Sequence, residues 1–206
     1  FFFKNVENVQ EDSLKEGNVR NLKSIVLQPR FLQAITAAAF AYAVMSFLMT
    51  ATPLSMHVME NMSLKETGLV LQFHVVAMFL PSLITGNLIK KYGHSAIIYG
   101  GVLFFFITVL LSLFEQTYLN YMLSLIFLGL GWNFLFISGT SLVVLTYNKE
   151  EKFKVQGIND LIVFSTMALA SLSAGILLNS IGWKMMNIIC IPCLLYTSPS
   201  PRDTPQ

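Results

Sequence analysis

The sequence predicts an all-α integral membrane protein. Of its 206 residues, 54% are hydrophobic and only 12% are charged, about half the charged share of soluble proteins. The apolar residues gather in runs of about 20, the length that an α-helix needs to cross the hydrocarbon layer of a bilayer. Between two such runs, residues 82–94 (SLITGNLIKKYGH) form a short basic turn marked by glycine. Such a turn is typical of a transmembrane hairpin whose loop faces the cytoplasm.

The composition also excludes several classes of partner and chemistry. The formal charge of +2 is too small to indicate nucleic acid as a partner. Cys190 and Cys193 are the only cysteines, so the chain has no disulfide framework. Their spacing encloses a proline within an apolar run, and we therefore expect neither redox chemistry nor a metal site there. We expect no cofactor, and membrane lipid is the first predicted partner.

Residues 31–193 form the predicted transmembrane domain. Five full spans are expected at about residues 31–58, 67–89, 95–114, 118–146 and 157–178. A partial sixth segment, residues 185–196, is interrupted by Pro192 and is shorter than the roughly 20 residues that a crossing requires.

The segments outside this domain are polar. Residues 4–30 have mixed charge and predict a linker, of which residues 19–26 have the apolar spacing of a short helix lying on the membrane surface. The chain begins with Phe1 rather than methionine, which we interpret as a start inside a longer protein. Residues 194–206 change to a proline-rich sequence that resembles a translated sequencing adapter, and we interpret them as a non-native tail.

The basic residues predict the orientation of the spans. The linker carries five lysines and arginines, the turn at residues 82–94 two, and the loop at residues 147–156 three. The alternate loops carry only Lys65 and Lys184. Because basic residues are enriched in cytoplasmic loops, this excess of ten to two predicts a multi-pass protein of the cell membrane with a cytoplasmic linker.

An internal repeat accompanies this topology. The pattern of residues 82–94 returns 89 positions later, at residues 171–183 (SLSAGILLNSIGW). Eight positions of residues 68–93 are identical to their counterparts, among them Gly86 and Gly93. The two copies lie on spans that run in opposite directions, which predicts a 3+3 inverted repeat.

The turn carries a resemblance to a known family. The segment GNLIKKYGH resembles the cytoplasmic loop motif of the major facilitator superfamily, in which glycine, leucine, an acidic residue, a basic residue and glycine recur. Gly86, Leu88, Lys91 and Gly93 match this pattern, whereas Lys90 stands where aspartate is usual. The blocks MTATP, HVVAMFLPS, GWNFLF and QGIND are similar to those of a bacterial group in the family. The resemblance covers about residues 20–190.

This resemblance implies a fold and a function. The chain is similar to the C-terminal six-helix half of a twelve-helix transporter of the bacterial inner membrane, with residues 1–3 ending the preceding helix. The family works by alternating access, with a small solute held between two halves and an ion gradient as the energy source. The N-terminal half and a small-molecule substrate are then the expected partners.

Two other classes of function compete with this interpretation. A non-transporting membrane receptor or assembly subunit built on the same fold is the main alternative, and the sequence leaves it open. A membrane-embedded enzyme is disfavoured, because it would need paired carboxylates or several histidines at a shared depth. Only His74 and Asp160 are available, and they are expected near opposite faces of the membrane.

Polar residues within the spans are the candidate site residues, because an unpaired polar group in lipid costs several kcal/mol. His74 ionises near neutral pH and could carry a coupling proton, or it could be a neutral histidine bonded to a neighbouring helix. Gln72 is close to it in sequence but two positions away on a helix, and therefore faces another direction.

Asn133 and Trp132 lie in the middle of the fourth span, in a glycine-rich stretch. Asn133 could bond a substrate or tie two helices together. Trp132 could stack on a substrate, although a packed tryptophan is the simpler interpretation.

Three polar residues open the fifth span. Gln156 and Asp160 are four positions apart and share a helix face, and Asn159 is adjacent. Asp160 could pair with lysines of the preceding loop as a gate or proton site, or it could simply be stabilised by the helix dipole.

Two prolines are expected to kink the spans that contain them. Pro53 lies in the first span and Pro81 in the second, and each removes a helical hydrogen bond. Interrupted helices often mark substrate sites in transporters, but prolines in spans are also common for packing reasons.

Overall fold

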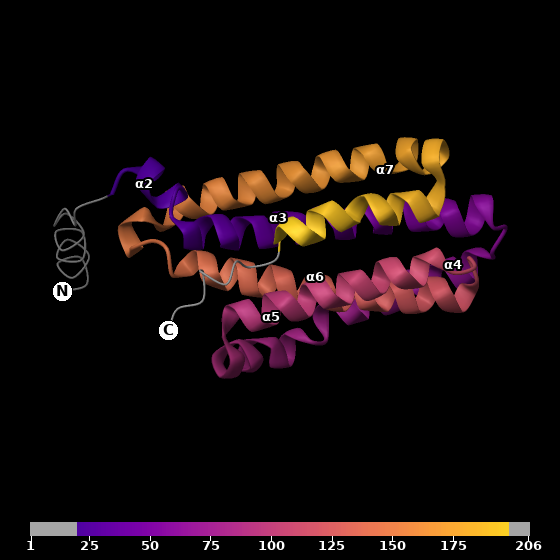
Figure 1. Ribbon diagram of the computed structural model, residues 1–206, viewed down its shortest axis with the longest axis horizontal. Coiled ribbons are helices and arrows are strands. Elements are labelled where there is room, and N and C mark those ends of the chain that lie inside the picture. The colour runs from indigo at the N-terminus through magenta and orange to yellow at the C-terminus, as the bar shows by residue number, and fades with distance from the viewer. Residues whose placement is uncertain (1–19, 198–206) are drawn as a thin grey trace, which may run out of the picture.

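The computed structural model describes the backbone of residues 20–197 and the side chains of residues 20–192. This part of the chain contains helices and no strand, which confirms the all-α prediction (Figure 1). The elements are α2 (Leu22–Val26), α3 (Pro29–Pro53), η1 (Leu54–Met59), α4 (Leu64–Phe79), α5 (Ser82–Leu113), α6 (Tyr118–Val144), η2 (Lys149–Glu151) and α7 (Lys152–Thr197). Four helical stretches of the described chain, two of which contain a reversal at a glycine, are long and apolar enough to cross a membrane.

Several predicted features lie outside the described residues. These are the end of a preceding helix at residues 1–3, the linker up to residue 19 and the tail beyond residue 197.

Helices α5 and α7 are each folded back on themselves at a glycine. Gly93 has φ 82° and ψ 163°, and Gly182 has φ 76° and ψ 169°. Glycine adopts positive φ without steric cost, so each position reverses the chain and divides its helix into two arms. Figure 1 shows the second arm of α7, in yellow, returning beside the first. The two glycines occupy equivalent positions in the two copies of the sequence pattern.

The predicted second span is broken in its middle. Helix α4 begins behind a capping box, in which Ser63 and Glu66 bond each other's backbone N–H groups, and it ends at Phe79. Helix α5 begins at Ser82, directly after Pro81. Because Pro81 has no N–H to donate, the hydrogen-bond ladder is interrupted here.

The first predicted span changes its helical type at the other proline. Helix α3 ends at Pro53 and continues as the six-residue π-helix η1. Just before the change, the Thr52 hydroxyl donates to the Leu48 carbonyl at 2.8 Å.

Helix α7 is longer at both ends than predicted. It begins at Lys152, after the single 3-10 turn η2, so the connection from α6 is shorter than the predicted loop at residues 147–156. Its second arm remains helical through Pro192 and ends at Thr197. The structure therefore has no break at Pro192, and residues 194–197 of the predicted tail continue the helix.

The short helix expected within residues 19–26 is α2, and its apolar side packs against the bundle. Its Ile25 side chain is buried and belongs to a cluster with Phe31 of α3, Val155 of α7 and two α6 residues, Leu142 and Val143. The apolar face of this short helix thus packs against the end of the bundle, because protein side chains are available there to cover it.

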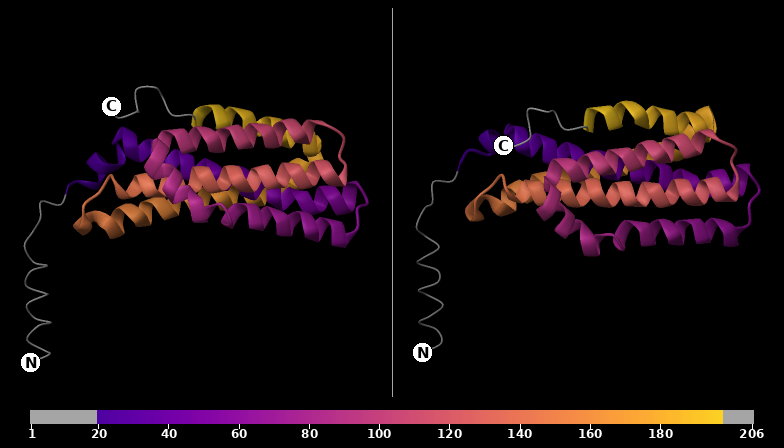
Figure 2. Two further views of the ribbon diagram at one scale, coloured as in Figure 1. Left: turned by 90° about the horizontal axis from the view of Figure 1, so that it is seen from below. Right: turned by 60° about the horizontal axis from the view of Figure 1, so that its bottom comes forward.

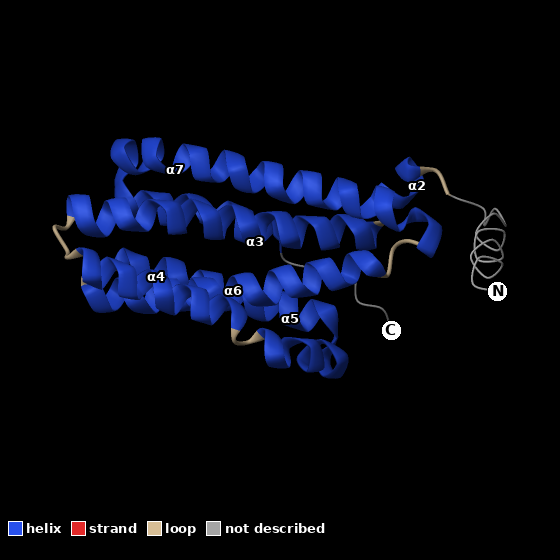
Figure 3. Ribbon diagram, turned by 180° about the vertical axis from the view of Figure 1, so that it is seen from behind, coloured by secondary structure: helices blue, strands red, loops and turns tan. Residues whose placement is uncertain are grey.

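Helix α6 packs against three other helices and lies at the centre of the bundle (Figures 2 and 3). Glycines allow these close approaches. A Cβ at Gly129 would lie 2.7 Å from the His74 carbonyl oxygen of α4, and one at Gly139 would lie 2.8 Å from the Ala34 carbonyl oxygen of α3. The buried polar residues of α6, Ser124, Asn133 and Ser138, therefore lie between closely packed helices.

Candidate functional site

His74 lies on the face of α4 that packs against α6. Its side chain is fully buried, and its Nδ1 is 2.7 Å from the Leu125 carbonyl oxygen. A carbonyl only accepts, so Nδ1 carries the proton and Nε2 holds a free lone pair. Within the described chain Nε2 is buried and has no protein partner. The geometry provides a neutral histidine tied to a neighbouring helix and, at Nε2, a proton acceptor. Gln72 is exposed on a different face of α4, as its spacing predicts.

Asn133 occupies the gap that Pro81 leaves between α4 and α5. Its Nδ2 donates to the Met78 carbonyl oxygen at 2.7 Å and to the Ser82 hydroxyl at 2.6 Å, and its Oδ1 accepts from the Thr85 hydroxyl at 2.7 Å. The side chain is completely buried and joins both sides of the break. Asn133 therefore ties α6 to the interrupted helix and supplies hydrogen bonds that the backbone has lost there.

Trp132 belongs to a group of rings that we call the aromatic cluster. Its members come from four helices and are Tyr42, Phe79, Trp132, Phe136 and Phe164. Trp132 stacks on Phe136 with ring centroids 4.9 Å apart, and Tyr42 meets Trp132 edge-on at 5.2 Å. The cluster combines a packed centre with open edges, because Trp132 is only 4% exposed whereas Phe164 is 51% exposed.

A pair of hydroxyl groups lies between α3 and α7, two of the four helices that form the aromatic cluster. Thr50 of α3 and Ser171 of α7 are 2.9 Å apart, Oγ1 to Oγ. Thr50 is exposed, and neither hydroxyl is enclosed in the packed core. We call these two side chains the hydroxyl pair.

Among the polar residues at the start of α7, Asn159 and Asp160 bond each other, whereas Gln156 bonds elsewhere. Gln156 donates from Nε2 to the Tyr147 hydroxyl at 2.7 Å. Asn159 is buried and donates from Nδ2 to Asp160 Oδ1 at 3.1 Å, while its Oδ1 has no partner within the described residues. Asp160 is exposed, and the described side chains include no ion pair between it and the nearby lysines.

The residues of the loop motif lie at the reversal in α5. Lys90 and Lys91 are exposed, Leu88 is partly buried, and Gly93 makes the turn itself. A Cβ at Gly86 would meet no atom within 4 Å, so no helix of the described bundle approaches it closely. The basic turn is thus presented outward from the bundle.

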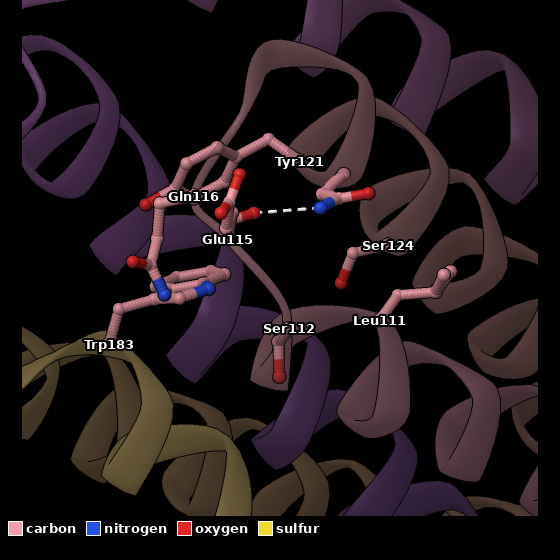
Figure 4. Close-up of a pocket in the computed structure, with 8 residues that line it drawn as sticks. Leu111, Ser112, Glu115, Gln116, Tyr121, Ser124 and Trp183 are labelled. Carbon is pink, nitrogen blue, oxygen red and sulfur yellow. Dashed lines mark hydrogen bonds between the residues drawn. The ribbon is translucent and has the colours of Figure 1, made fainter.

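A small cavity lies where α5 ends, away from the basic turn, and Figure 4 shows residues that line it. Its walls come from the end of α5, the start of α6 and the second arm of α7, and include Glu115, Tyr121 and Trp183. Its volume is ≈ 10 Å³, room for about one water molecule. A small organic solute does not fit, so this cavity is excluded as its binding site.

Comparison of the sequence with known proteins identifies its family. The profile of the Major Facilitator Superfamily matches residues 14–197, nearly the whole chain. The protein belongs to the major facilitator superfamily. It is therefore a multi-pass membrane protein of a transporter family and not an enzyme.

Three members of the superfamily are similar to this chain. The riboflavin transporter RfnT of Brucella anthropi is 40% identical over 173 residues, which cover 84% of this chain and 43% of the relative. The uncharacterised MFS-type transporters YdeG and YddS of Bacillus subtilis are 27% and 31% identical over 89% and 76% of this chain. The chain spans about 43%, 43% and 38% of the lengths of these relatives.

The sequence alone identified some residues of the candidate site and missed others. His74, Asn133 and Trp132 stood out because each is a polar or indole side chain within an apolar run. Tyr42 and Phe164 gave no comparable signal, because aromatic residues are frequent in every span. Only the packing of α3, α6 and α7 brings their rings together.

Proposed function

We propose that this chain is the C-terminal half of a secondary active transporter that moves a flavin-like solute by alternating access. The observation that carries the proposal is its 40% identity to a riboflavin transporter over 84% of the chain. Its coverage of about 43% of that relative fits one half of a twelve-helix protein. The other half is then the partner of the bundle, and the solute binds between the two.

The proposed architecture is a 3+3 inverted repeat. Gly93 and Gly182 reverse the chain at equivalent positions in the two copies. This supports a correspondence between two pairs of spans. The pair that runs from α3 to the first arm of α5 corresponds to the pair that runs from α6 to the first arm of α7. The ten-to-two excess of basic residues supports a cytoplasmic position for the linker and for the turn at residues 82–94.

The aromatic cluster supports a flat, conjugated substrate. Aromatic side chains stack on other ring systems, and each such pair contributes about 0.5–1.5 kcal/mol beyond the area it buries. Phe79 and Phe164 are 59% and 51% exposed at the edges of the cluster, so ring surface is left uncovered by the helices of this half. The isoalloxazine ring of a flavin is a ligand of this kind.

His74 supports coupling to protons. Nε2 is a buried acceptor with no protein partner among the described residues, and the bond from Nδ1 to Leu125 fixes the ring orientation. Asp160 is the second candidate, because it is exposed at the predicted cytoplasmic start of α7, near Lys152 and Lys154. We propose that a proton gradient drives accumulation.

Uptake of riboflavin by the complete protein tests this function. The complete gene is expressed in a bacterium that neither makes nor imports riboflavin, and accumulation of labelled riboflavin is followed with and without a protonophore. We expect saturable uptake that the protonophore abolishes. Binding of riboflavin without any uptake would instead support the receptor alternative. A protein that neither binds nor moves a flavin would exclude the proposed substrate.

A further inference from the structure

We infer that the hydroxyl pair recognises the polyol chain of the solute, while the exposed edge of the aromatic cluster takes its ring system. This inference rests on the proposed function, because it assigns the two parts of a flavin to two parts of the same site. It adds a specificity element, Thr50 with Ser171, that bonds one part of the substrate.

The distance between the aromatic cluster and the hydroxyl pair along α3 and α7 fits a solute that has a ring system and a polyol chain. Tyr42 and Phe164 are in ring contact between the two helices, with centroids 5.9 Å apart. Thr50 lies eight residues beyond Tyr42, and Ser171 seven beyond Phe164. At 1.5 Å per residue, the hydroxyl pair is displaced from the ring contact by about 11 Å along both helices. Riboflavin has a similar layout, since a sugar-alcohol chain extends from one side of its ring system.

The hydroxyl pair has unused hydrogen-bonding capacity. Two hydroxyl groups carry two protons and four lone pairs, and the contact between Thr50 and Ser171 uses one of each. One proton and three lone pairs are left for a ligand. Thr50 is exposed on the bundle, and hydroxyls that faced lipid would leave this capacity unsatisfied. A polyol chain supplies both donors and acceptors and therefore complements the pair.

Phe164 and Ser171 also lie on the same face of α7. Seven residues correspond to nearly two full turns, so the two side chains project in almost the same direction. A single ligand lying along α7 can therefore contact both. Thr166, which lies between them in sequence, differs because its hydroxyl already donates to the Ile162 carbonyl at 2.6 Å.

Two flavins that share one ring system test the inference. Riboflavin carries the polyol chain, whereas lumiflavin has a methyl group in its place. Equilibrium binding of each to the complete protein is measured for the wild type, Thr50→Val, Ser171→Ala and Phe164→Leu, with Thr166→Val as the matched control. We expect each hydroxyl variant to weaken riboflavin binding about tenfold and to leave lumiflavin binding unchanged. Phe164→Leu should weaken both equally, and Thr166→Val neither.

The possible failures are distinguishable. If the wild type binds both flavins and the hydroxyl variants weaken both equally, the pair only holds α3 and α7 together and the inference is wrong. It is also wrong if those variants change neither affinity. If the wild type binds neither flavin, the proposed function fails, and the inference fails with it.

Discussion

Arg20 and Glu151 are 131 positions apart in the chain and form a two-pronged ion pair. Arg20 donates from Nη2 to Glu151 Oε2 at 2.7 Å and from Nε to Oε1 at 3.0 Å, and its backbone N–H also donates to Oε1. Arg20 Nη2 donates in addition to the Thr146 carbonyl. The Glu151 side chain is only 2% exposed. This contact fixes the segment before α2 to the connection between α6 and α7.

The ion pair predicts a pH-dependent difference in stability. Hydrogen bonds from the Arg20 side chain, and then from the Asn148 backbone, hold the pKa of Glu151 at about 2, below its ordinary value. A lowered carboxyl pKa stabilises the fold above the ordinary value of about 4.3, and this contribution is lost as the pH falls towards 2. We therefore expect Glu151→Gln to lower the midpoint of thermal unfolding in detergent at pH 7, and the gap from the wild type to narrow below pH 4.

The adjacent Glu150 provides the matched control for this prediction. It is exposed, so Glu150→Gln should leave the midpoint nearly unchanged at both pH values. A gap for Glu151→Gln that stays constant between pH 7 and pH 3 would contradict the role of the ion pair.

Two glycines should differ in how well they tolerate substitution by alanine, because α4 lies close to Gly129 of α6 and no helix of the described bundle lies close to Gly86. A Cβ at Gly129 would lie 2.7 Å from the His74 carbonyl oxygen and 2.9 Å from Ala77 Cβ, so Gly129→Ala should push the helices apart and destabilise the protein by about 1–3 kcal/mol. A Cβ at Gly86 would meet nothing within 4 Å, so Gly86→Ala should change the stability of this bundle by less than about 0.5 kcal/mol. Unfolding by denaturant in detergent measures both, and equal effects would argue against this packing.

The hydrogen bonds of Asn133 predict a role in holding the broken helix. Asn133→Leu removes the side-chain donor to the buried Met78 carbonyl and one of the two acceptors of the Thr85 hydroxyl, and should destabilise the protein by about 1–2 kcal/mol. Asn179 is an exposed asparagine of α7, and Asn179→Leu serves as the control with little expected change. The free energy of unfolding is the measurement, and similar values for both variants would exclude the proposed role.

If His74 carries the coupling proton, its substitution should affect accumulation driven by a pH gradient but not downhill exchange. In the complete protein, His74→Gln should abolish accumulation driven by a pH gradient and preserve downhill exchange of substrate. Glutamine can still donate to the Leu125 carbonyl, but it cannot take up a proton in the working range. Asp160→Asn, assayed in parallel, tests the second candidate. Unchanged accumulation by His74→Gln would leave this residue with a structural role alone.

The orientation predicts which side of the membrane each loop faces. Single cysteines at positions 91 and 65 of a cysteine-free protein should react with membrane-impermeant reagents from opposite sides, because Lys91 lies in the basic turn and Lys65 in an alternate loop. Intact cells should label the Lys65→Cys variant, and inverted vesicles the Lys91→Cys variant. Labelling of both variants in intact cells would refute this topology.

The sequence by itself determined the class of the protein and the places where the chain turns. Long apolar runs require helices in lipid, because every backbone N–H and C=O group must then bond within its own segment. Glycine at 93 and 182 marked the reversals, because a positive φ is easily adopted only by glycine. These are local consequences of residue type, and they are readable without knowledge of neighbouring helices.

Only the tertiary structure decided what the polar and aromatic residues contact. Asn133 could have faced a ligand or a helix, and its three bonds across the break at Pro81 became visible only when α6 was placed beside α4 and α5. Thr50 and Ser171 are 121 positions apart, and nothing in the sequence indicated that their hydroxyls meet. Their contact arises from the packing of α3 against α7, and spacing along one helix cannot predict such a contact between helices.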